Sequence, residues 1–392
     1  MSTRISIPAI RGLAEVMQAL PVARLVGGVV RDCLAGVPMG DIDIATPATP
    51  EQVIEFLTAA HLRAVPTGLA HGTVTAVSKS RGFEITTLRR DLHTDGRHAV
   101  VEFCDDWQID AARRDFTINA MSADFAGQVY DYFGGVEDLA AGRVRFVGNP
   151  RDRIAEDYLR ILRFFRFFAR FGRTPPDAES MAALNEGAPN LTSLSVERIW
   201  HELRGILSTA APLEAVTLMQ KTAVLAVLFP QTSDLATFTR LLAKNAPPNP
   251  LLRLSALTSE DEIALAQRLK FSRAEATTLI GLRHGIVPDP SMQDGDLRRL
   301  LADEEAEILC GRVWLGPCDA PQSLALTQRI LSLPKPEFPL RGNDGLALGA
   351  KPGRRLGQAL AATRAWWLET GCTADHQTCR THLAGILSQN QK

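Results

Sequence analysis

The stretch LVGGVVRDCLAGVPMGDIDIAT, residues 25 to 46, indicates the fold of this chain most directly. The mainly apolar residues 23–26 predict a strand that ends at Gly27 and Gly28, where a helix begins. Glycine lets the backbone approach a phosphate group closely, and the N-terminus of a helix offers free N–H groups to it. Arg31 adds a fixed positive charge. This half of the stretch therefore predicts a phosphate-binding turn, with an ordinary tight turn as the alternative.

The other half of the stretch contains two carboxylates, Asp41 and Asp43. On a strand, residues i and i+2 point to the same side of the sheet. Two carboxylates on one side suit a divalent metal ion that a nucleoside triphosphate carries. Taken alone, this half could also be an ordinary acidic turn.

Taken together, the two halves resemble the signature of the class II tRNA nucleotidyltransferases and bacterial poly(A) polymerases. The resemblance implies that Asp41 and Asp43 are catalytic and hold the metal, which we expect to be Mg²⁺. It also implies that Gly28 and Arg31 hold the triphosphate. The resemblance is strong over residues 20–205 and weak in the remainder of the chain.

Composition and charge allow several domains but indicate no membrane segment. A chain of 392 residues with 45% hydrophobic residues is expected to form two or three domains, and it contains no run of 18 apolar residues. The net charge of −1 does not by itself indicate RNA binding. Nine arginines between Arg143 and Arg173 nevertheless form a strip that could contact phosphates. The six cysteines form no C-x-x-C pair, and no Walker motif occurs.

The head of the chain shows the periodicities of a mixed α and β structure. Residues 1–20 are expected to form an amphipathic helix. Residues 74–77, 83–87 and 100–103 have sequences typical of strands. Thr49, followed by proline, predicts the start of a helix.

From about residue 151 the strand signals disappear and long helical periods follow. We therefore predict an α+β fold: a nucleotidyltransferase head with a mixed β-sheet, followed by an all-α neck, body and tail. The resemblance implies that the head is polymerase-β-like. Proline-rich stretches at residues 245–250 and 334–339 interrupt the helical part. The expected domains are a catalytic head, a neck with base-reading helices, a helical body and a tRNA-binding tail: residues 1–150, 151–212, 213–333 and 334–392.

Two further groups in the head are candidates for the site. Glu84, in the second of the expected strands, is a candidate third catalytic carboxylate, with an ordinary solvent-facing residue as the alternative. Residues 113–120, RRDFTINA, form a doubly basic turn that enters a helix, and a surface helix start is the alternative. This block resembles a family motif that contacts the sugar and phosphates of the nucleotide. The resemblance assigns that role first to Arg114, then to Asp115, with Arg113 as a substitute.

Residues 88–98 lie between these two groups and are polar, charged and glycine-containing, so a mobile loop is expected. Their TDGRH segment, residues 94–98, resembles the flexible loop of full CCA-adding enzymes. In the family this loop is associated with addition of the terminal adenosine, and enzymes that add only cytidines lack it.

Residues 151–171 are expected to form one helix with phenylalanines on one side. Asp157 begins a slowly winding row in which Arg160, Arg163 and Arg166 follow at every third residue. From periodicity alone, a solvated basic face is the favoured interpretation. The EDYLR sequence around Asp157 resembles the family's EDxxR motif, which implies that these four residues bind the nucleotide and select its base.

Hydrogen-bond chemistry explains how such a row can select a base without a nucleic-acid template. A carboxylate accepts from an exocyclic amino group, and a guanidinium donates to ring nitrogens and carbonyls. Cytosine and adenine offer an amino group beside a ring acceptor, whereas uracil and guanine present a carbonyl there and leave the carboxylate unpaired. Asp157 and Arg160 are therefore expected to accept CTP and ATP and to reject UTP and GTP.

The remaining motifs are less specific. Residues 191–203, LTSLSVERIWHEL, also resemble a family motif and are expected to act as scaffolding for the neck. Residues 341–345 and 351–357 contain glycines and basic residues, so they could hold an RNA backbone or form a plain turn between helices. For Trp366 and Trp367 we favour packing over stacking on RNA.

The resemblance as a whole implies a CCA tRNA nucleotidyltransferase that uses CTP and ATP on tRNA, with Mg²⁺ and without a membrane or protein partner. We expect it in the cytoplasm, and residues 1–14 leave a mitochondrial presequence as the alternative. A poly(A) polymerase and a split-function enzyme that adds only CC or only A are the rival enzymes. A non-catalytic RNA-binding module is the alternative from another class.

Overall fold

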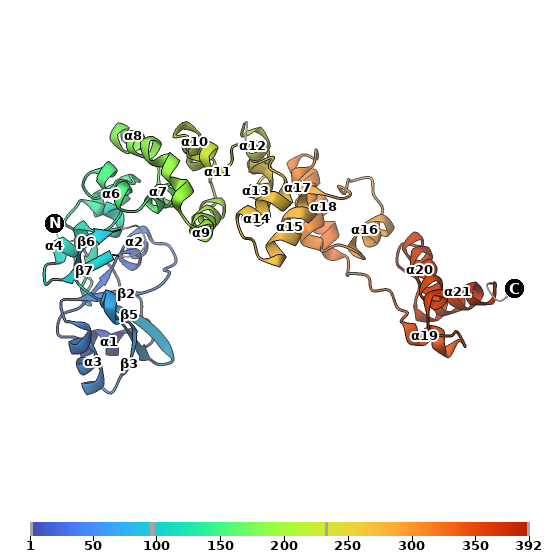
Figure 1. Cartoon of the computed structure of the whole chain (residues 1–392), viewed down its shortest axis with the longest axis horizontal. Helices are drawn as coiled ribbons and strands as arrows, with labels where there is room; N and C mark the ends of the chain where they lie inside the picture. Colours follow the sequence, from blue (N-terminus) through green and yellow to red (C-terminus); the bar gives the residue numbers. More distant parts are fainter. Residues whose placement is uncertain (1–2, 95–98, 232–233, 390–392) are drawn as a thin grey trace. The chain divides into compact units, whose positions relative to one another are not determined.

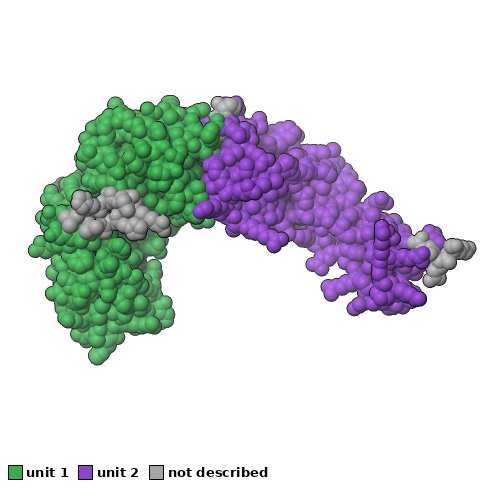
Figure 2. Space-filling model, viewed as in Figure 1, with its two compact units in different colours: residues 1–230 green, residues 231–392 purple. Residues whose placement is uncertain are grey.

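The structure is a computed structural model that describes residues 3–94, 99–231 and 234–389. The chain divides into two compact units, residues 1–230 and 231–392 (Figure 2). All the described strands lie in unit 1, whereas unit 2 is built from helices and the turns between them. The four-part division into head, neck, body and tail stays a prediction.

A seven-stranded mixed β-sheet forms the centre of the head (Figure 1). Its strands follow the order β3-β4-β5-β2-β1-β8-β9, in which β2 and β5 are parallel and the other neighbours antiparallel. β6 and β7 form a separate antiparallel pair. The bounds are β1 (Arg24–Val26), β2 (Asp43–Thr46), β3 (Arg63–Gly68), β4 (Thr73–Ser78), β5 (Arg81–Thr87), β6 (Arg89–Thr94), β7 (Ala99–Phe103), β8 (Ser122–Ala123) and β9 (Val129–Tyr130).

Helices surround this sheet and continue the chain of unit 1 beyond it (Figure 1). Together with the mixed sheet, they confirm the predicted α+β class. Their bounds are α1 (Leu13–Ala19), α2 (Gly28–Ala35), α3 (Pro50–Ala59), α4 (Trp107–Ala112), α5 (Gly135–Ala141), α6 (Pro150–Glu156), α7 (Leu159–Phe171), α8 (Ala178–Gly187), α9 (Val196–Leu207), α10 (Leu213–Lys221) and α11 (Val224–Leu228), with the 3₁₀ turns η1 (Leu69–His71), η2 (Thr117–Asn119) and η3 (Ala188–Ser193).

Unit 2 buries apolar side chains between its helices, in one cluster around Leu309 and Val313 and another around Trp367 and Leu383. No helix in the described part of the chain is long and apolar enough to cross a bilayer. The helices of this unit are α12 (Ala236–Ala243), α13 (Pro250–Leu257), α14 (Glu262–Arg268), α15 (Arg273–Arg283), α16 (Asp294–Leu301), α17 (Ala306–Leu315), α18 (Ala320–Ser332), α19 (Gly342–Ala347), α20 (Arg354–Glu369) and α21 (His376–Gln389).

The three expected strands are confirmed within β4, β5 and β7, and Thr49 caps α3 as predicted. The expected helix over residues 1–20 is wrong in extent, because helix α1 begins only at Leu13. Before it, the chain pairs with the turn after β8: the Ile5 N–H donates to the Gly127 carbonyl at 2.9 Å.

The expected loop over residues 88–98 is also partly wrong. Residues 89–94 form β6, and this strand pairs in antiparallel register with β7, from Arg89 opposite Phe103 to Thr94 opposite Ala99. The sequence reasoning missed the strand because residues 89–94 lack the regular apolar alternation that marks a half-buried strand. Residues 95–98 of the TDGRH segment lie outside the described residues.

The single helix expected over residues 151–171 is divided into α6 and α7. Asp157 has an extended backbone, with φ −157° and ψ 107°, and ends α6. Its Oδ1 atom accepts from the Leu159 N–H at 3.0 Å, so the side chain satisfies an orphan donor in the first turn of α7. The break therefore places Asp157 at the start of α7 and not on its face.

Phenylalanines join α7 to the head. The rings of Phe116 and Phe146 are 4.9 Å apart, and Phe146 stacks on Phe164 of α7 at 5.6 Å. All three side chains are almost fully buried. Such aromatic contacts stabilise beyond the buried area alone, so this core fixes residues 113–120 against α7.

Candidate active site

The two candidate metal-binding carboxylates lie at the start of β2, beside the end of β1. Antiparallel pairing sets Leu25 opposite Ile44, which brings the turn after β1 next to the residues before β2. Asp43 is half-buried and Asp41 is exposed. Burial raises the pKa of Asp43, and the neighbouring carboxylates of Glu84 and Asp41 raise it further. Crowded negative charge of this kind favours a bound cation.

Glu84 lies beside this pair but outside the cavity described below. It is opposite Asp43 in the parallel register of β2 and β5, and its side chain is exposed. Within the described ranges, no group of three or more His, Cys, Asp or Glu side chains is arranged to hold a metal ion. The catalytic role of Glu84 stays a prediction.

The turn between β1 and α2 depends on Gly27. This residue has a φ of +67°, and a Cβ atom added to it would lie 2.9 Å from the Arg114 Nη1 atom. L-residues with side chains adopt a positive φ only with strain. Gly28 is the first residue of α2 and lines the cavity. The sequence indicated Gly28 for the site, whereas the backbone geometry requires glycine at Gly27.

Arg31 lies deep in the site, only 6% exposed. Its guanidinium forms an ion pair with Asp32 at 2.8 Å and donates to the Asn119 Oδ1 atom. It also lies 4.9 Å from the ring centroids of both Phe167 and Phe171. Burial lowers the pKa of Arg31, and Asp32 opposes that effect. These contacts hold a cation in one place before any anion binds.

Asp115 connects the block of residues 113–120 to helix α7. It is 7% exposed, and its Oδ2 atom accepts from Arg163 at 2.6 Å. Its Oδ1 atom accepts from the Phe116 N–H at 2.9 Å and the Asn119 Nδ2 atom at 3.0 Å. Burial alone would raise the Asp115 pKa, but Arg163 and these hydrogen bonds lower it below 3.8. Asp115 thus links Arg163 through Asn119 to Arg31.

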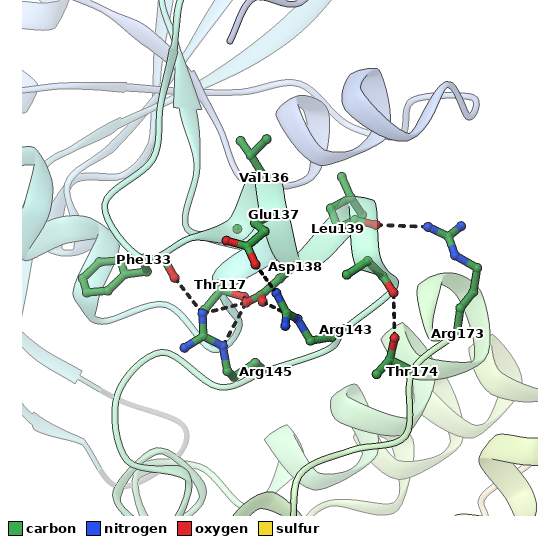
Figure 3. A network of polar contacts seen from close by, with 12 residues as sticks. Thr117, Phe133, Val136, Glu137, Asp138, Leu139, Arg143, Arg145, Arg173 and Thr174 are labelled. Atoms are coloured by element: carbon green, nitrogen blue, oxygen red, sulfur yellow. Dashed lines mark hydrogen bonds and ion pairs between the residues drawn. The ribbon is translucent and has the colours of Figure 1, made fainter. Parts of the chain in front are cut away.

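A second carboxylate, Asp138 of α5, anchors the same block from the other side. The Thr117 Oγ1 atom donates to Asp138 at 2.6 Å, and the Nε atoms of Arg143 and Arg145 each donate at 3.0 Å. Figure 3 shows the carboxylate of Asp138 between these three partners. Thr117 begins the 3₁₀ turn η2 that carries Asn119. The buried Asp138 therefore fixes the turn from which Asn119 reaches Arg31.

Asp157 and Arg160, the two residues of the EDxxR motif that line the cavity, are also held by protein groups. Asp157 accepts from Arg198 of α9 at 2.7 Å. Arg160 forms an ion pair with Glu156 and donates to the carbonyls of Arg153 at 2.9 Å and Arg113 at 3.1 Å. The guanidinium plane of Arg160 is thus fixed.

These side chains surround one cavity of about 520 Å³, a size typical of sites for small ligands. Seven arginines and five aspartates line it, so it suits an anion that carries a metal ion. The predicted residues that it brings together are Gly28, Arg31, Asp41, Asp43, Arg114, Asp157, Arg160, Arg163 and Arg166, with Arg113 and Asp115 beside them. The sequence reasoning did not assign Asp32, Asn119, Phe167 and Arg170 to the site. Asp32 lies within the stretch of residues 25–46, Asn119 within residues 113–120, and Arg170 within the arginine-rich strip of residues 143–173.

The donor set fits a divalent metal ion that arrives with a triphosphate. Mg²⁺ is bound in such sites by one or two carboxylates, while substrate phosphates and water complete its octahedron. Asp41 and Asp43 supply that number of carboxylates, and burial together with the neighbouring Glu84 and Asp41 raises the pKa of Asp43, an effect that a bound cation opposes.

Comparison with known proteins agrees with this reading. Residues 23–145 match the family described as Poly A polymerase head domain, and residues 176–235 that described as Probable RNA and SrmB- binding site of polymerase A. The mitochondrial CCA tRNA nucleotidyltransferase 1 of Homo sapiens is 38% identical over 363 residues, which cover 89% of this chain and 83% of that protein. Its Mus musculus counterpart is 37% identical over 367 residues, with the same coverage of 89% and 83%.

A solved structure agrees as well. The Bacillus stearothermophilus CCA-adding enzyme in complex with CTP matches with a TM-score of 0.72 and 25% identity, and 96% of each chain is covered. The fold and the site therefore define a nucleotidyltransferase. More narrowly, the chain belongs to the CCA tRNA nucleotidyltransferase family, as its resemblance over residues 20–205 had indicated.

Proposed function

We infer that this chain adds C, C and A to the 3′ end of tRNA, using CTP and ATP and no nucleic-acid template. The observation that carries this function is one cavity that brings together the carboxylates of Asp41 and Asp43 and the side chains of Asp157, Arg160, Arg163 and Arg166. The names of the matched relatives, and the CTP in the matched solved structure, support the same activity.

The reaction is an in-line displacement at the α-phosphate of the nucleotide. The 3′-hydroxyl of the tRNA attacks that phosphorus, and pyrophosphate leaves. A divalent ion, which we propose to be Mg²⁺, activates the hydroxyl and neutralises the leaving pyrophosphate when bound. Asp41 and Asp43 would hold it. Arg31 and Arg114, with the N–H groups at Gly28, bind and orient the triphosphate, so that the chain contributes mainly position and charge.

Base choice is proposed to depend on Asp157 and Arg160. Asp157 accepts from the amino group that cytosine and adenine share, and Arg160 donates to the neighbouring ring acceptor. Arg163 and Arg166 reach the base or the triphosphate. Because protein contacts hold Asp157 and Arg160, they cannot turn freely to satisfy a carbonyl in its place. Uracil and guanine then leave buried polar groups unpaired, which discriminates strongly against them.

The deciding experiment is an addition assay on tRNA transcripts that end before the CCA, after the two cytidines, or after the complete CCA. Each transcript is incubated with CTP, ATP or both, and the products are sized at single-nucleotide resolution. Addition of C, C and A, with no product on the complete tRNA, is the expected result. Asp41→Ala and Asp43→Ala should abolish transfer while the far-ultraviolet circular dichroism stays unchanged. Retained activity in either variant would refute the metal assignment.

The rival activities give different products. A poly(A) polymerase is the second candidate because the matched head domain carries that description. It would make long adenosine tails from ATP alone. A stop after two cytidines, or addition of adenosine only, would indicate a split-function enzyme.

For the cellular location we propose the cytoplasm. The matched human and mouse proteins are named mitochondrial, so the proposal needs a direct test. Fractionation of cells that express the chain with a C-terminal tag would place it, and recovery in an organelle fraction would contradict the proposal.

A further inference from the structure

Helix α9 carries side chains that contact two of the proposed nucleotide-binding residues, Asp157 before α7 and Arg166 within it. Arg198 and Glu202 lie four residues apart and hence on one face of α9. The Arg198 Nη2 atom is 2.7 Å from the Asp157 Oδ2 atom, and the Glu202 Oε2 atom is 2.7 Å from the Arg166 Nε atom. Helix α9 thus pairs the Arg198 guanidinium with the Asp157 carboxylate and the Glu202 carboxylate with the Arg166 guanidinium.

The contacts of Asp157 hold both of its carboxylate oxygens. Oδ1 accepts from the Leu159 N–H at 3.0 Å, and Oδ2 accepts from Arg198 at 2.7 Å. Each oxygen can accept two hydrogen bonds, so the pair keeps capacity for the amino group of a base. The Asp157 side chain is 21% exposed and lines the cavity, whereas Arg198 is not among the described residues that line it. The contact of Arg198 with Asp157 therefore connects it to the cavity.

We propose that Arg198 is a positioning residue for base choice, because its guanidinium holds the Asp157 carboxylate in the orientation that accepts cytosine or adenine and rejects uracil. The proposal rests on the proposed function, since it concerns which nucleotide the same cavity takes. The sequence alone had suggested only scaffolding for residues 191–203.

The physical reason is that rejection requires a carboxylate that cannot turn away. Uracil is rejected because its carbonyl meets an acceptor and leaves that acceptor unpaired. Without Arg198, the Leu159 N–H holds only Oδ1, and the carboxylate can rotate about its last torsion angle. A carboxylate that rotates toward solvent removes the penalty for uracil more than it weakens the bond to cytosine. The loss of Arg198 should thus reduce selectivity more than rate.

The experiment measures kcat/KM for CTP and for UTP on a tRNA transcript that ends before the CCA. Wild type is compared with Arg198→Met, which keeps the length of the side chain, and with Arg198→Gln, which keeps a hydrogen-bond donor. Arg204→Met is the matched control, because Arg204 lies on the same helix and is exposed. All four proteins are also compared by thermal unfolding.

In Arg198→Met we expect the preference for CTP over UTP to fall about tenfold, the loss expected when one charge-assisted hydrogen bond no longer orients an acceptor. Arg198→Gln should fall between this variant and wild type, and Arg204→Met should match wild type. In an Asp157→Ala background, Arg198→Met should cause no further change in the preference, because its effect passes through Asp157.

An equal loss of CTP and UTP addition in both Arg198 variants would overturn the proposal. The contact of Arg198 with Asp157 would then serve only to stabilise the packing of α9 against α7. A further fall in the preference in the Asp157→Ala background would overturn it as well. If Arg198→Met does not fold, Arg198→Gln decides by the same criteria. Wild type that adds no CTP to tRNA would refute the proposed function instead, and the ratio of the CTP and UTP dissociation constants, measured without RNA, then decides the role of Arg198.

Discussion

Replacing Asp115 by asparagine is expected to destabilise unit 1 by about 3 kcal/mol. Asp115 is 7% exposed, and donors face both of its oxygens: Arg163 at 2.6 Å on one side, and the Phe116 N–H and Asn119 amide at 2.9 and 3.0 Å on the other. Asparagine keeps the shape but turns an NH₂ group toward one set of these donors. Leaving a buried charge without its partner costs roughly 3–5 kcal/mol. We take the low end because the Arg163 side chain is 31% exposed and Glu202 remains 4.0 Å away.

The measurement is thermal unfolding of the full chain. For a unit of this size, about 3 kcal/mol corresponds to a Tm lowered by about 6–12 °C. Asp105→Asn, at an exposed carboxylate in the same unit, is the control and should stay within about 0.5 kcal/mol of wild type. An Asp115→Asn protein as stable as the control would refute the reasoning, because the pair with Arg163 would then contribute nothing net.

The pH dependence of the same pair has a definite sign. Arg163 and the hydrogen bonds lower the folded-state pKa of Asp115 below its ordinary value of 3.8. The contribution of Asp115 to stability is therefore fully present above pH 3.8 and is lost as the pH falls through the lower, folded-state pKa. The difference in Tm between wild type and Asp115→Asn should be constant near neutral pH and should shrink below pH 3.8. A difference that already disappears by pH 6 would contradict this assignment.

Three further substitutions test the site. Asp43→Asn should abolish transfer and raise the Tm in EDTA, because burial and neighbouring carboxylates raise the Asp43 pKa and so destabilise its charged form. A lower Tm would show that the charge of Asp43 does not destabilise the fold. Gly27→Ala should cost about 1–3 kcal/mol in urea unfolding, since φ is +67° and the new Cβ would lie 2.9 Å from Arg114; an unchanged midpoint would mean that the turn relaxes. Gly205→Ala should raise the KM for CTP and ATP together by about tenfold, because its Cβ would lie 2.6 Å from the Arg166 Cδ atom and would displace that side chain; an unchanged KM would separate Arg166 from nucleotide binding.

The paired tryptophans show where a sequence pattern stops being informative. Trp367 is 2% exposed and packs in the core of unit 2, which confirms packing for this residue. Trp366 is only half-buried and stacks on His382 at 4.1 Å. Adjacent residues of a helix point about 100° apart, so two identical side chains can meet different surroundings. Only packing decides which of them is buried.

Asp157 and the arginines that follow it are a second example of the limit of sequence patterns. Spacing along the sequence showed that arginines recur after Asp157, but it also indicated an uninterrupted helix. Two hydrogen bonds to the Asp157 carboxylate stabilise the break. One comes from the neighbouring Leu159 N–H, and the other comes from Arg198, which lies 41 residues away in the sequence. Periodicity reports local backbone preferences and carries no information on such distant partners.

The sequence by itself determined the fold class and located the glycine turn after residue 26, the two carboxylates and the block of residues 113–120. Each of these depends on neighbours in the chain: glycine conformations, alternation along strands, and motifs that are contiguous in sequence. Only the tertiary structure decided how these pieces combine. It linked Arg31 through Asn119 and Asp115 to Arg163 and left Glu84 outside the cavity. Those contacts join residues far apart in sequence, and they form only when packing of the phenylalanine core sets α7 against the head.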